Sequence, residues 1–134
     1  MTSIKWHKHT ADVEFTVETK TVNTLFEQSI IAVTQTMVDI ESVDSIIQKY
    51  FEFPKDNIER ALFNVLSEII YLKDAEQFIV SSCTVHITEQ VQVTLQGTFM
   101  NDTIEQRVDV KAITMHKFKV EHNDSWNARV VLDI

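Results

Sequence analysis

The sequence contains one glycine, Gly97, and one proline, Pro54, in 134 residues. Average usage is roughly 7% and 5% for these two residue types. With one glycine the chain can form neither a P-loop nor a dinucleotide-binding fingerprint, because both need several glycines beside the phosphates. Turns must rely on Asn and Asp, which tolerate left-handed backbone conformations. Gly97 is therefore expected to mark a β-bulge or a close approach of two backbones.

The single cysteine and the lack of a long apolar run exclude further classes. Cys83 cannot form an internal disulfide and lies in a strand-like run, so we expect a small sheet residue and not a nucleophile. No apolar run reaches the ~18 residues that a membrane helix needs. Residues 1–8 are polar and contain no apolar core of a signal peptide. We therefore expect a cytoplasmic protein without a membrane partner.

Basic residues are also few, with 12 Lys and Arg against 20 Asp and Glu and a formal net charge of −8. A protein that binds nucleic acid through its phosphates should carry a basic face. Here the basic residues are scattered, and the one local concentration is Lys111, Lys117 and Lys119. The composition disfavours direct binding of DNA or RNA and leaves a local basic patch open. An acidic surface suits a basic protein partner or a cation.

The rest of the composition, 44% apolar and 24% charged, is typical of a folded globular domain. Apolar residues at helical spacing predict a helix from Thr21 or Thr24 to about Val38, and a second from an Asp56 cap to about Leu72. Alternating patterns predict strands at 4–9, 12–18, 49–53, 78–88, 90–100, 104–110, 113–121 and 126–134. We predict an α+β fold in which residues 1–134 form a single two-layer domain, with two helices packed on a mostly antiparallel β-sheet.

Polar residues near both ends of the chain could hold a metal. His7 and His9 share one face of a predicted strand and Asp12 follows, a set that could bind a transition metal or simply be exposed polar residues. Asp133 and the terminal carboxylate of Ile134 supply hard oxygens that suit Ca²⁺ or Mg²⁺, or merely end the last strand. If the strands at Asp12 and Asp133 are antiparallel neighbours, the two carboxylates meet at one end of the sheet. Their repulsion would then favour a cation.

Three further positions have both a structural and a functional interpretation. Lys111 and His116 are an odd number of residues apart, so they face opposite sides of a strand unless a bulge intervenes. They could donate to an anion or be ordinary outward-facing residues. Glu68 borders the apolar stripe of the second predicted helix and could pair with a base or be solvated. Nucleophilic catalysis has little support, because no Ser lies in a G-x-S-x-G setting and Cys83 has no basic neighbours.

Five segments, in order along the chain, resemble motifs of the archease family. Residues 6–12 (WHKHTAD) resemble its opening aromatic followed by His-Thr-Ala-Asp, and residues 24–27 (TLFE) resemble the start of its first helix. Residues 66–72 (LSEIIYL) resemble its second-helix motif, and residues 109–116 (DVKAITMH) resemble its Val-Lys-Ala-x-Thr-Tyr-His segment. The chain also ends in Asp-Ile, as family members do. The chain departs from the family pattern at Glu14, Ser67, Thr98 and Met115.

The resemblance implies an accessory protein, not an enzyme, that activates an RtcB-type RNA ligase in tRNA splicing and RNA repair. That ligase joins 2′,3′-cyclic phosphate or 3′-phosphate ends to a 5′-hydroxyl, through a guanylylated histidine, with GTP and a divalent metal. The accessory protein promotes guanylylation and multiple turnover. It would meet RNA only through the ligase.

The resemblance also implies where the functional residues lie. It places a divalent-metal site, usually assigned Ca²⁺ with Mg²⁺ or Mn²⁺ as alternatives, on Asp12, Asp133 and Ile134. It places partner contacts at His9, Glu68, Lys111 and His116. Two other functions stay open on the residues alone. One is a metal-dependent hydrolase that uses His7, His9 and Asp12, and the other is a general chaperone-like interaction module with an acidic face.

Overall fold

The computed structural model describes residues 2–8 and 12–134. Within them, two α-helices and one short 3-10 helix alternate with seven strands. The helices are α1 (Val22–Met37), η1 (Ile40–Ser42) and α2 (Ile58–Glu76). The strands are β1 (Ser3–Lys8), β2 (Asp12–Thr19), β3 (Ile47–Pro54), β4 (Phe78–Ile87), β5 (Gln90–Phe99), β6 (Ala112–His122) and β7 (Trp126–Asp133).

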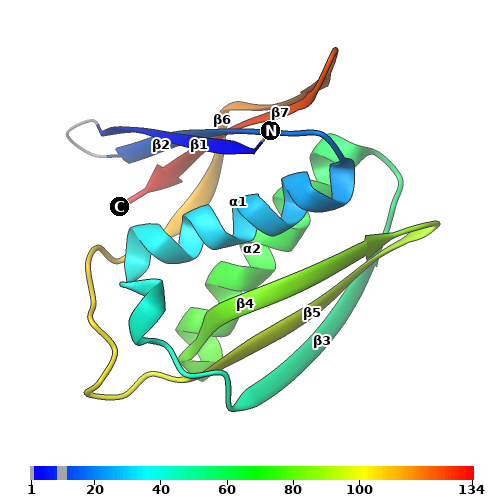
Figure 1. The fold of residues 1–134 in the computed structure, drawn as a ribbon. Helices are drawn as coiled ribbons and strands as arrows, with labels where there is room; N and C mark the ends of the chain where they lie inside the picture. The colour runs from blue at the N-terminus through cyan, green and yellow to red at the C-terminus, as the bar shows by residue number, and fades with distance from the viewer. Residues whose placement is uncertain (1, 9–11) are drawn as a thin grey trace.

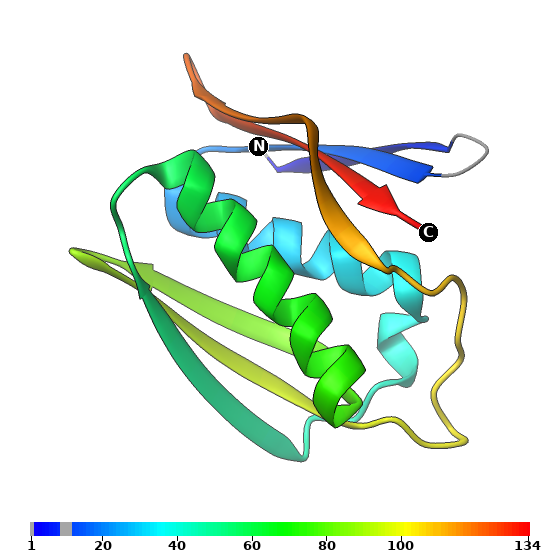
Figure 2. The same cartoon turned by 180° about the vertical axis from the view of Figure 1, so that it is seen from behind.

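The strands form two antiparallel sheets with the helices between them (Figures 1 and 2). One sheet has the order β1-β2-β7-β6 and the other has the order β3-β5-β4. Helix α1 contacts β2 and β7 on one side and β4 on the other, while α2 contacts β6 on one side and β3 and β4 on the other. The α+β class, the two helices and the antiparallel strands are confirmed. The strands form two sheets instead of the one expected, so each helix is covered from both sides.

The buried residues of the helices explain this arrangement. In α1 they include residues on well over a third of the helix circumference, among them Leu25, Phe26, Ile30 and Thr34. A stripe that wide cannot be buried by a single sheet, because a helix resting on one sheet buries one face of roughly 100° or somewhat more. One hydrophobic core therefore extends from the first sheet through both helices to the second.

Both helices begin at side-chain caps. Thr21, one of the two caps that the sequence left open, caps α1 by accepting a hydrogen bond from the backbone N–H of Thr24 at 3.2 Å. The predicted Asp56 cap of α2 is wrong, because Asn57 accepts from the Arg60 N–H at 3.0 Å. Helix α2 also continues about one turn beyond the expected end. It stops where Gln77 adopts a left-handed conformation and donates its N–H to the last turn.

The strand predicted at 104–110 is absent from the described part of the chain. These residues form an irregular segment that joins β5 to β6, with one isolated bridge between Val38 and Gln106. The segment packs along the end of α1, where Asp39 donates to the Glu105 carbonyl at 2.8 Å and Arg107 donates to the Met37 carbonyl at 2.7 Å. Its backbone groups are thus satisfied by a helix end and not by a neighbouring strand.

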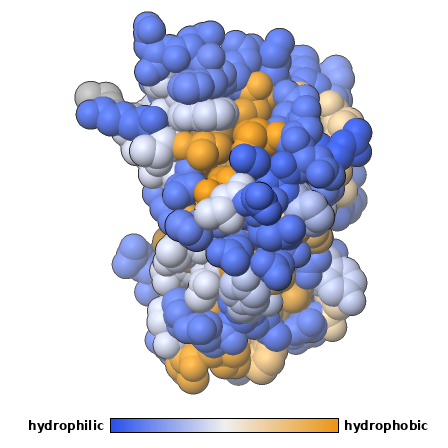
Figure 3. Space-filling model, turned by 90° about the vertical axis from the view of Figure 1, so that its right-hand side faces the viewer, coloured by the Kyte–Doolittle hydropathy of each residue, from blue (hydrophilic) through white to orange (hydrophobic). Residues whose placement is uncertain are grey.

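The surface is mostly polar on the side that Figure 3 shows, with an apolar strip in its upper half. Across residues 2–8 and 12–134, no helix combines the length and apolar character needed to cross a membrane.

The only glycine lies where two backbones approach closely, as the sequence predicted. Gly97 in β5 is buried opposite Val80, at a register shift in β4 between Val80 and Ser82. A Cβ at this position would overlap the carbonyl oxygen of Ile79. The Ile79 oxygen belongs to the main chain, so it cannot rotate away as the end of a flexible side chain could.

We expect Gly97→Ala to lower the free energy of unfolding by about 3 kcal/mol, because the added methyl group forces β4 and β5 apart. Urea denaturation of the purified variant measures this. Thr94→Ala, in the same strand at a half-buried position, is the matched control and should cost less than about 1 kcal/mol. Equal midpoints for Gly97→Ala and the wild type would contradict the close approach.

Candidate functional site

Strands β2 and β7 are antiparallel neighbours, and their register places Asp12 directly opposite Asp133. Asp12 is the first residue of β2 and Asp133 is the last of β7, so both lie at one end of the four-stranded sheet. Residues directly opposite each other in such a pair project from the same face, with their Cβ atoms ~5 Å apart. The condition set out from the sequence, that these two strands are antiparallel neighbours, is met.

The surroundings of Asp12 suit a cation. Its carboxylate oxygen Oδ1 is buried and has no hydrogen-bond partner among the described residues. An unpaired buried carboxylate oxygen is costly, and a second carboxylate opposite adds repulsion. A divalent ion would remove both penalties, and carboxylate oxygens are the ligands that Ca²⁺ and Mg²⁺ prefer.

The described side chains supply only part of such a site. Within residues 2–8 and 12–134, no group of three His, Cys, Asp or Glu side chains could hold a metal. A third oxygen must therefore come from elsewhere. Ile134 directly follows Asp133 and is half-buried against the core, which places its main-chain oxygens at the same sheet end.

Lys111 lies beside this carboxylate pair. Its backbone N–H donates to the carbonyl of Asp133 at 2.8 Å, and the next residue, Ala112, is paired with Asp133 in the sheet. Asp133 thus has Asp12 on one neighbouring strand and the Lys111–Ala112 backbone on the other. The Lys111 side chain is exposed and lines a hollow beside α2.

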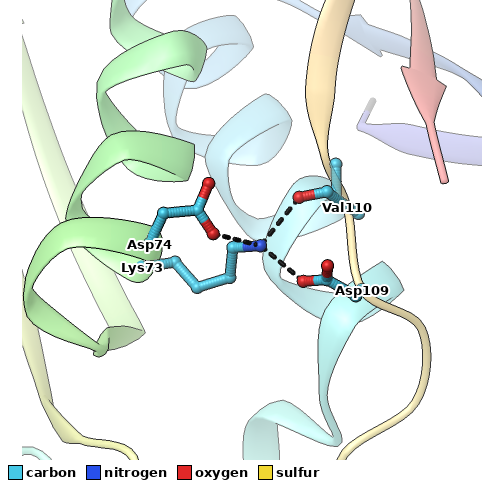
Figure 4. A network of polar contacts seen from close by, with 4 residues as sticks. All are labelled: Lys73, Asp74, Asp109 and Val110. Carbon is cyan, nitrogen blue, oxygen red and sulfur yellow. Dashed lines mark hydrogen bonds and ion pairs between the residues drawn. The ribbon is translucent and has the colours of Figure 1, made fainter.

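A half-buried lysine of α2, Lys73, fixes the backbone that leads into β6 (Figure 4). The Nζ atom of Lys73 donates to Asp109 at 2.5 Å and to the Val110 carbonyl at 2.7 Å, and it pairs with Asp74 at 2.8 Å. Burial alone lowers the pKa of Lys73, but the hydrogen bonds and negative charges of Asp109 and Asp74 outweigh it and raise the pKa. The cation therefore stays charged and holds residues 109–110 next to α2.

His116 lies in a wide bulge. The register of β6 against β7 shifts between Thr114 and Lys119, and Lys117 has a φ of 59°. Five residue steps along β6 thus correspond to two along β7. His116 is exposed on this bulge, away from the strand segment that pairs with Asp133. The bulge also invalidates the simple odd-even argument for Lys111 and His116.

Glu68 is not among the α2 residues that line the hollow beside Lys111. Ser67, Tyr71 and Asp74 of α2 line this hollow, about 430 Å³ in volume, together with Lys111 and Ile113. Burial, and after it the charge of Glu76, raise the pKa of Glu68. The structure therefore brings the second-helix motif to Lys111 through Ser67 and Tyr71, not through Glu68.

Among residues 2–8 and 12–134, the remaining candidates do not gather into a second site. His7 is exposed on the edge strand β1, opposite Glu14. His9 lies outside the described residues. Cys83 is half-buried in β4, and burial, together with the charge of Glu27, raises the pKa of its thiol to about 12. The thiol is therefore protonated at neutral pH, as expected for a residue that is not a nucleophile.

Comparison with known proteins assigns the family. The sequence profile of the archease protein family matches residues 5–134. An archease from Archaeoglobus fulgidus is 32% identical over 130 residues, which cover 94% of this chain and 95% of that protein. The chain belongs to the archease family. An archease from Methanothermobacter thermautotrophicus is 29% identical and covers 93% of this chain and 94% of its own length.

Solved structures show the same fold. Protein 1598 of Methanobacterium thermoautotrophicum, solved in solution, superposes with a TM-score of 0.82 at 21% identity, over 98% of each chain. A crystal structure from Thermotoga maritima, described as an archease and possible chaperone, gives 0.71 at 20% identity, over 97% of this chain and 96% of that one. The two-sheet arrangement around the helices is therefore the archease fold.

The four departures from the archease pattern lie in different surroundings. Glu14 is nearly buried and pairs with Arg129 at 3.3 Å, while Thr98 is buried in β5. Ser67 lines the hollow beside Lys111, and Met115 is 64% exposed on the bulge of β6. Of the four, Met115 is exposed and Ser67 is half-buried at the surface of this archease.

The sequence did not single out Lys73. A lysine in the last turn of a helix usually indicates only an interaction with the helix dipole or the last carbonyls. Its partner Asp109 is 36 positions away, so the pairing follows from the packing of α2 against the segment before β6. This contact anchors the archease motif that begins at Asp109.

We expect Lys73→Met to lower the free energy of unfolding by about 2 kcal/mol at neutral pH, because the charge-assisted hydrogen bonds of Lys73 to Asp109 and Val110 are lost. It should also speed hydrogen exchange at the Lys111 N–H. Since the folded-state pKa of Lys73 is raised, the difference from wild type should persist up to the ordinary lysine pKa of about 10.4 and shrink as the pH rises through the folded-state value. Lys55→Met, at an exposed position, is the control and should leave both readouts unchanged.

We expect Glu68→Gln to raise the melting temperature slightly at pH 7. A raised folded-state pKa means that ionised Glu68 is less favourable in the folded protein, so its ionisation costs stability above that pKa. The gain should stay below about 1 kcal/mol because the side chain is partly solvated. It should vanish below about pH 4, where wild-type Glu68 is protonated in both states. A loss of stability at pH 7 would assign Glu68 a stabilising ionic contact instead.

Proposed function

We propose that this archease is a cytoplasmic accessory protein, without catalytic activity of its own, that activates an RtcB-type RNA ligase. It would promote guanylylation of the ligase and its multiple turnover in tRNA splicing and RNA repair. Membership of the archease family supports the proposal, and one observation carries it at the level of the site. This is the pairing of Asp12 with Asp133 at a sheet end, where Asp12 has a buried oxygen without a partner among the described residues.

In this proposal Asp12, Asp133 and the carboxylate of Ile134 hold a divalent cation, Ca²⁺ in the first place and Mg²⁺ or Mn²⁺ as alternatives. When bound, the cation offers positive charge to phosphate oxygens of the ligase nucleotide. The chain's own residues orient the carboxylates, since the β2–β7 register fixes Asp12 against Asp133 and Lys111 anchors Asp133 from the other side. The exposed side chains of Lys111 and Tyr71 would contact the ligase around this end, with His9 and His116 as further contacts.

A chaperone-like role is the second candidate. The Thermotoga maritima protein is described as a possible chaperone, and it shares this fold. A chaperone would bind many basic proteins through the acidic surface, in a salt-sensitive manner and without a dedicated cation site. The Asp12–Asp133 pair favours the activator, because general binding needs no two carboxylates in register.

The decisive variant is Asp12→Asn, which keeps the shape of the side chain and removes its charge. We expect Ca²⁺ to raise the melting temperature of the wild type. At a Ca²⁺ concentration of a hundred times its dissociation constant, the free energy of unfolding should increase by about 2.7 kcal/mol. Asp12→Asn should lose this rise. It should also be more stable than wild type without metal, because the repulsion from Asp133 is gone. In a ligase guanylylation assay without RNA, the variant should no longer stimulate.

Asp124→Asn provides the matched control. Asp124 is exposed in the turn between β6 and β7, at the opposite end of the sheet, so this variant should behave as wild type. The activator proposal would be overturned if folded Asp12→Asn stimulated guanylylation as fully as the control. If Ca²⁺ stabilised Asp12→Asn as much as wild type, Asp12 would not be a cation ligand and the cation site would be ruled out.

A further inference from the structure

The outer face of the four-stranded sheet carries a groove that collects basic side chains from three strands. It has a volume of about 590 Å³ and is crossed by all four strands. Four cations line it, and two carboxylates accompany them. The cations are Lys5, Lys117, Lys119 and Arg129, and the carboxylates are Glu18 and Glu121. The whole protein has a formal net charge of −8, so this groove has the opposite balance.

The register places three of these cations in a single row across the strands. Lys5 of β1 is opposite Thr16 of β2, Thr16 is opposite Arg129 of β7, and Arg129 is opposite Lys119 of β6. Four strands at ~4.8 Å spacing give the row a length of ~14 Å. The bulge of β6 adds Lys117 to the same groove.

Two of the four cations are free to meet an external anion. Arg129 pairs with Glu14, and Lys119 pairs with Glu121, both at 3.3 Å. Lys5 and Lys117 have no carboxylate within 4 Å in residues 2–8 and 12–134. Of the two groove carboxylates, Glu121 belongs to the Lys119 pair, while Glu18 keeps its negative charge and accepts a hydrogen bond from Ser125 at 2.7 Å. The unpaired cations, Lys5 and Lys117, therefore lie at the two sides of the row.

The lining favours a phosphate backbone over a protein surface. Between the cations it offers the hydroxyl groups of Ser3 and Thr16, which are usual partners of phosphate and sugar oxygens. The side-chain amide of Asn127 also lines the groove but donates to Ser125. The aromatic ring in the lining, Phe118, is buried and packs edge-to-face on Phe63 at 5.3 Å. A protein partner would need exposed apolar anchors, and sequence-specific RNA binding would need stacking platforms.

The groove lies on the same face as the candidate cation site. Thr16 and Arg129 are each four residues from Asp12 and Asp133 along their strands, which corresponds to ~13 Å. An RNA strand whose end lies beside the Asp12–Asp133 pair could therefore extend its backbone to the cations. The sequence indicated only indirect contact with RNA because Lys5, Lys117, Lys119 and Arg129 are distributed over the whole chain.

We propose that this groove binds the phosphate backbone of the RNA strand that the ligase is joining, with Lys5 and Lys117 as the main phosphate contacts. The proposal rests on the proposed ligase-activating function and adds a second contact, between this archease and the RNA itself. Binding is independent of base sequence and sensitive to salt.

The test uses Lys5→Gln with Lys117→Gln, and fluorescence anisotropy with a single-stranded oligouridylate. Each lost phosphate contact lowers the slope of log affinity against log salt by about 0.7. The double variant should therefore lose about 1.4 from the slope and bind roughly 25-fold more weakly at 0.1 M salt. Lys55→Gln with Arg60→Gln makes the same change in charge outside the groove and should bind as wild type. Melting temperatures of both variants verify that they are folded.

Two ligase assays separate this proposal from the previous one. The groove variant should stimulate guanylylation without RNA as wild type does, yet stimulate multiple-turnover RNA joining less. Asp12→Asn should lose both effects. Equal RNA affinity of the groove and control variants, or no binding of the oligouridylate by wild type at low salt, would overturn the groove proposal. Weaker ligase binding with unchanged RNA affinity would also overturn it, and would assign the groove to an acidic surface of the ligase.

Discussion

The pairing of β2 with β7 is the constraint on which the rest of the candidate site depends. It brings together residues more than 100 positions apart and sets one register along eight residue pairs. That register places Asp12 opposite Asp133 and Thr16 opposite Arg129. A slip of one residue would turn every side chain to the other face and move Phe15 and Val130 out of the core. The apolar packing of the inner face therefore fixes the polar arrangement of the outer face.

The helices pack on the inner face of this sheet and protect one edge strand of each sheet. Lys73 of α2 holds the segment before β6, which then pairs with Asp133. Glu59 of α2 accepts a hydrogen bond from Val120 N–H at 2.9 Å, on the edge strand β6, and Glu27 of α1 does the same for Val85 on the edge strand β4. Exposed strand edges invite pairing with other chains, and a helix carboxylate placed on the free N–H opposes that. Each helix thus links the two sheets and covers one edge.

The proposed functions divide the outer face of one sheet into two parts. Its end carries acidic groups and would bind a cation next to the ligase nucleotide. Its middle carries basic groups and would bind the RNA backbone ~13 Å away. The two parts have opposite charge, which lets an acidic protein approach a nucleic acid in one orientation. The bulge of β6 serves this division, because it turns Lys117 into the groove and Met115 and His116 outward.

Local patterns in the sequence determined the strands near 12–18 and 78–100, the Thr21 cap, the role of Gly97 and, through five short motifs, the family. These features depend on residues close together in the chain. The tertiary structure alone decided that the strands form two sheets, that residues 104–110 pack on a helix end, and that Ser67 and Tyr71, but not Glu68, line the hollow beside Lys111. It also decided that Lys73 reaches Asp109 and that Lys5, Arg129 and Lys119 share a row. Each of these features depends on strand register or on how packed elements are rotated relative to one another. Neither the register nor the rotation is encoded in the spacing of nearby residues.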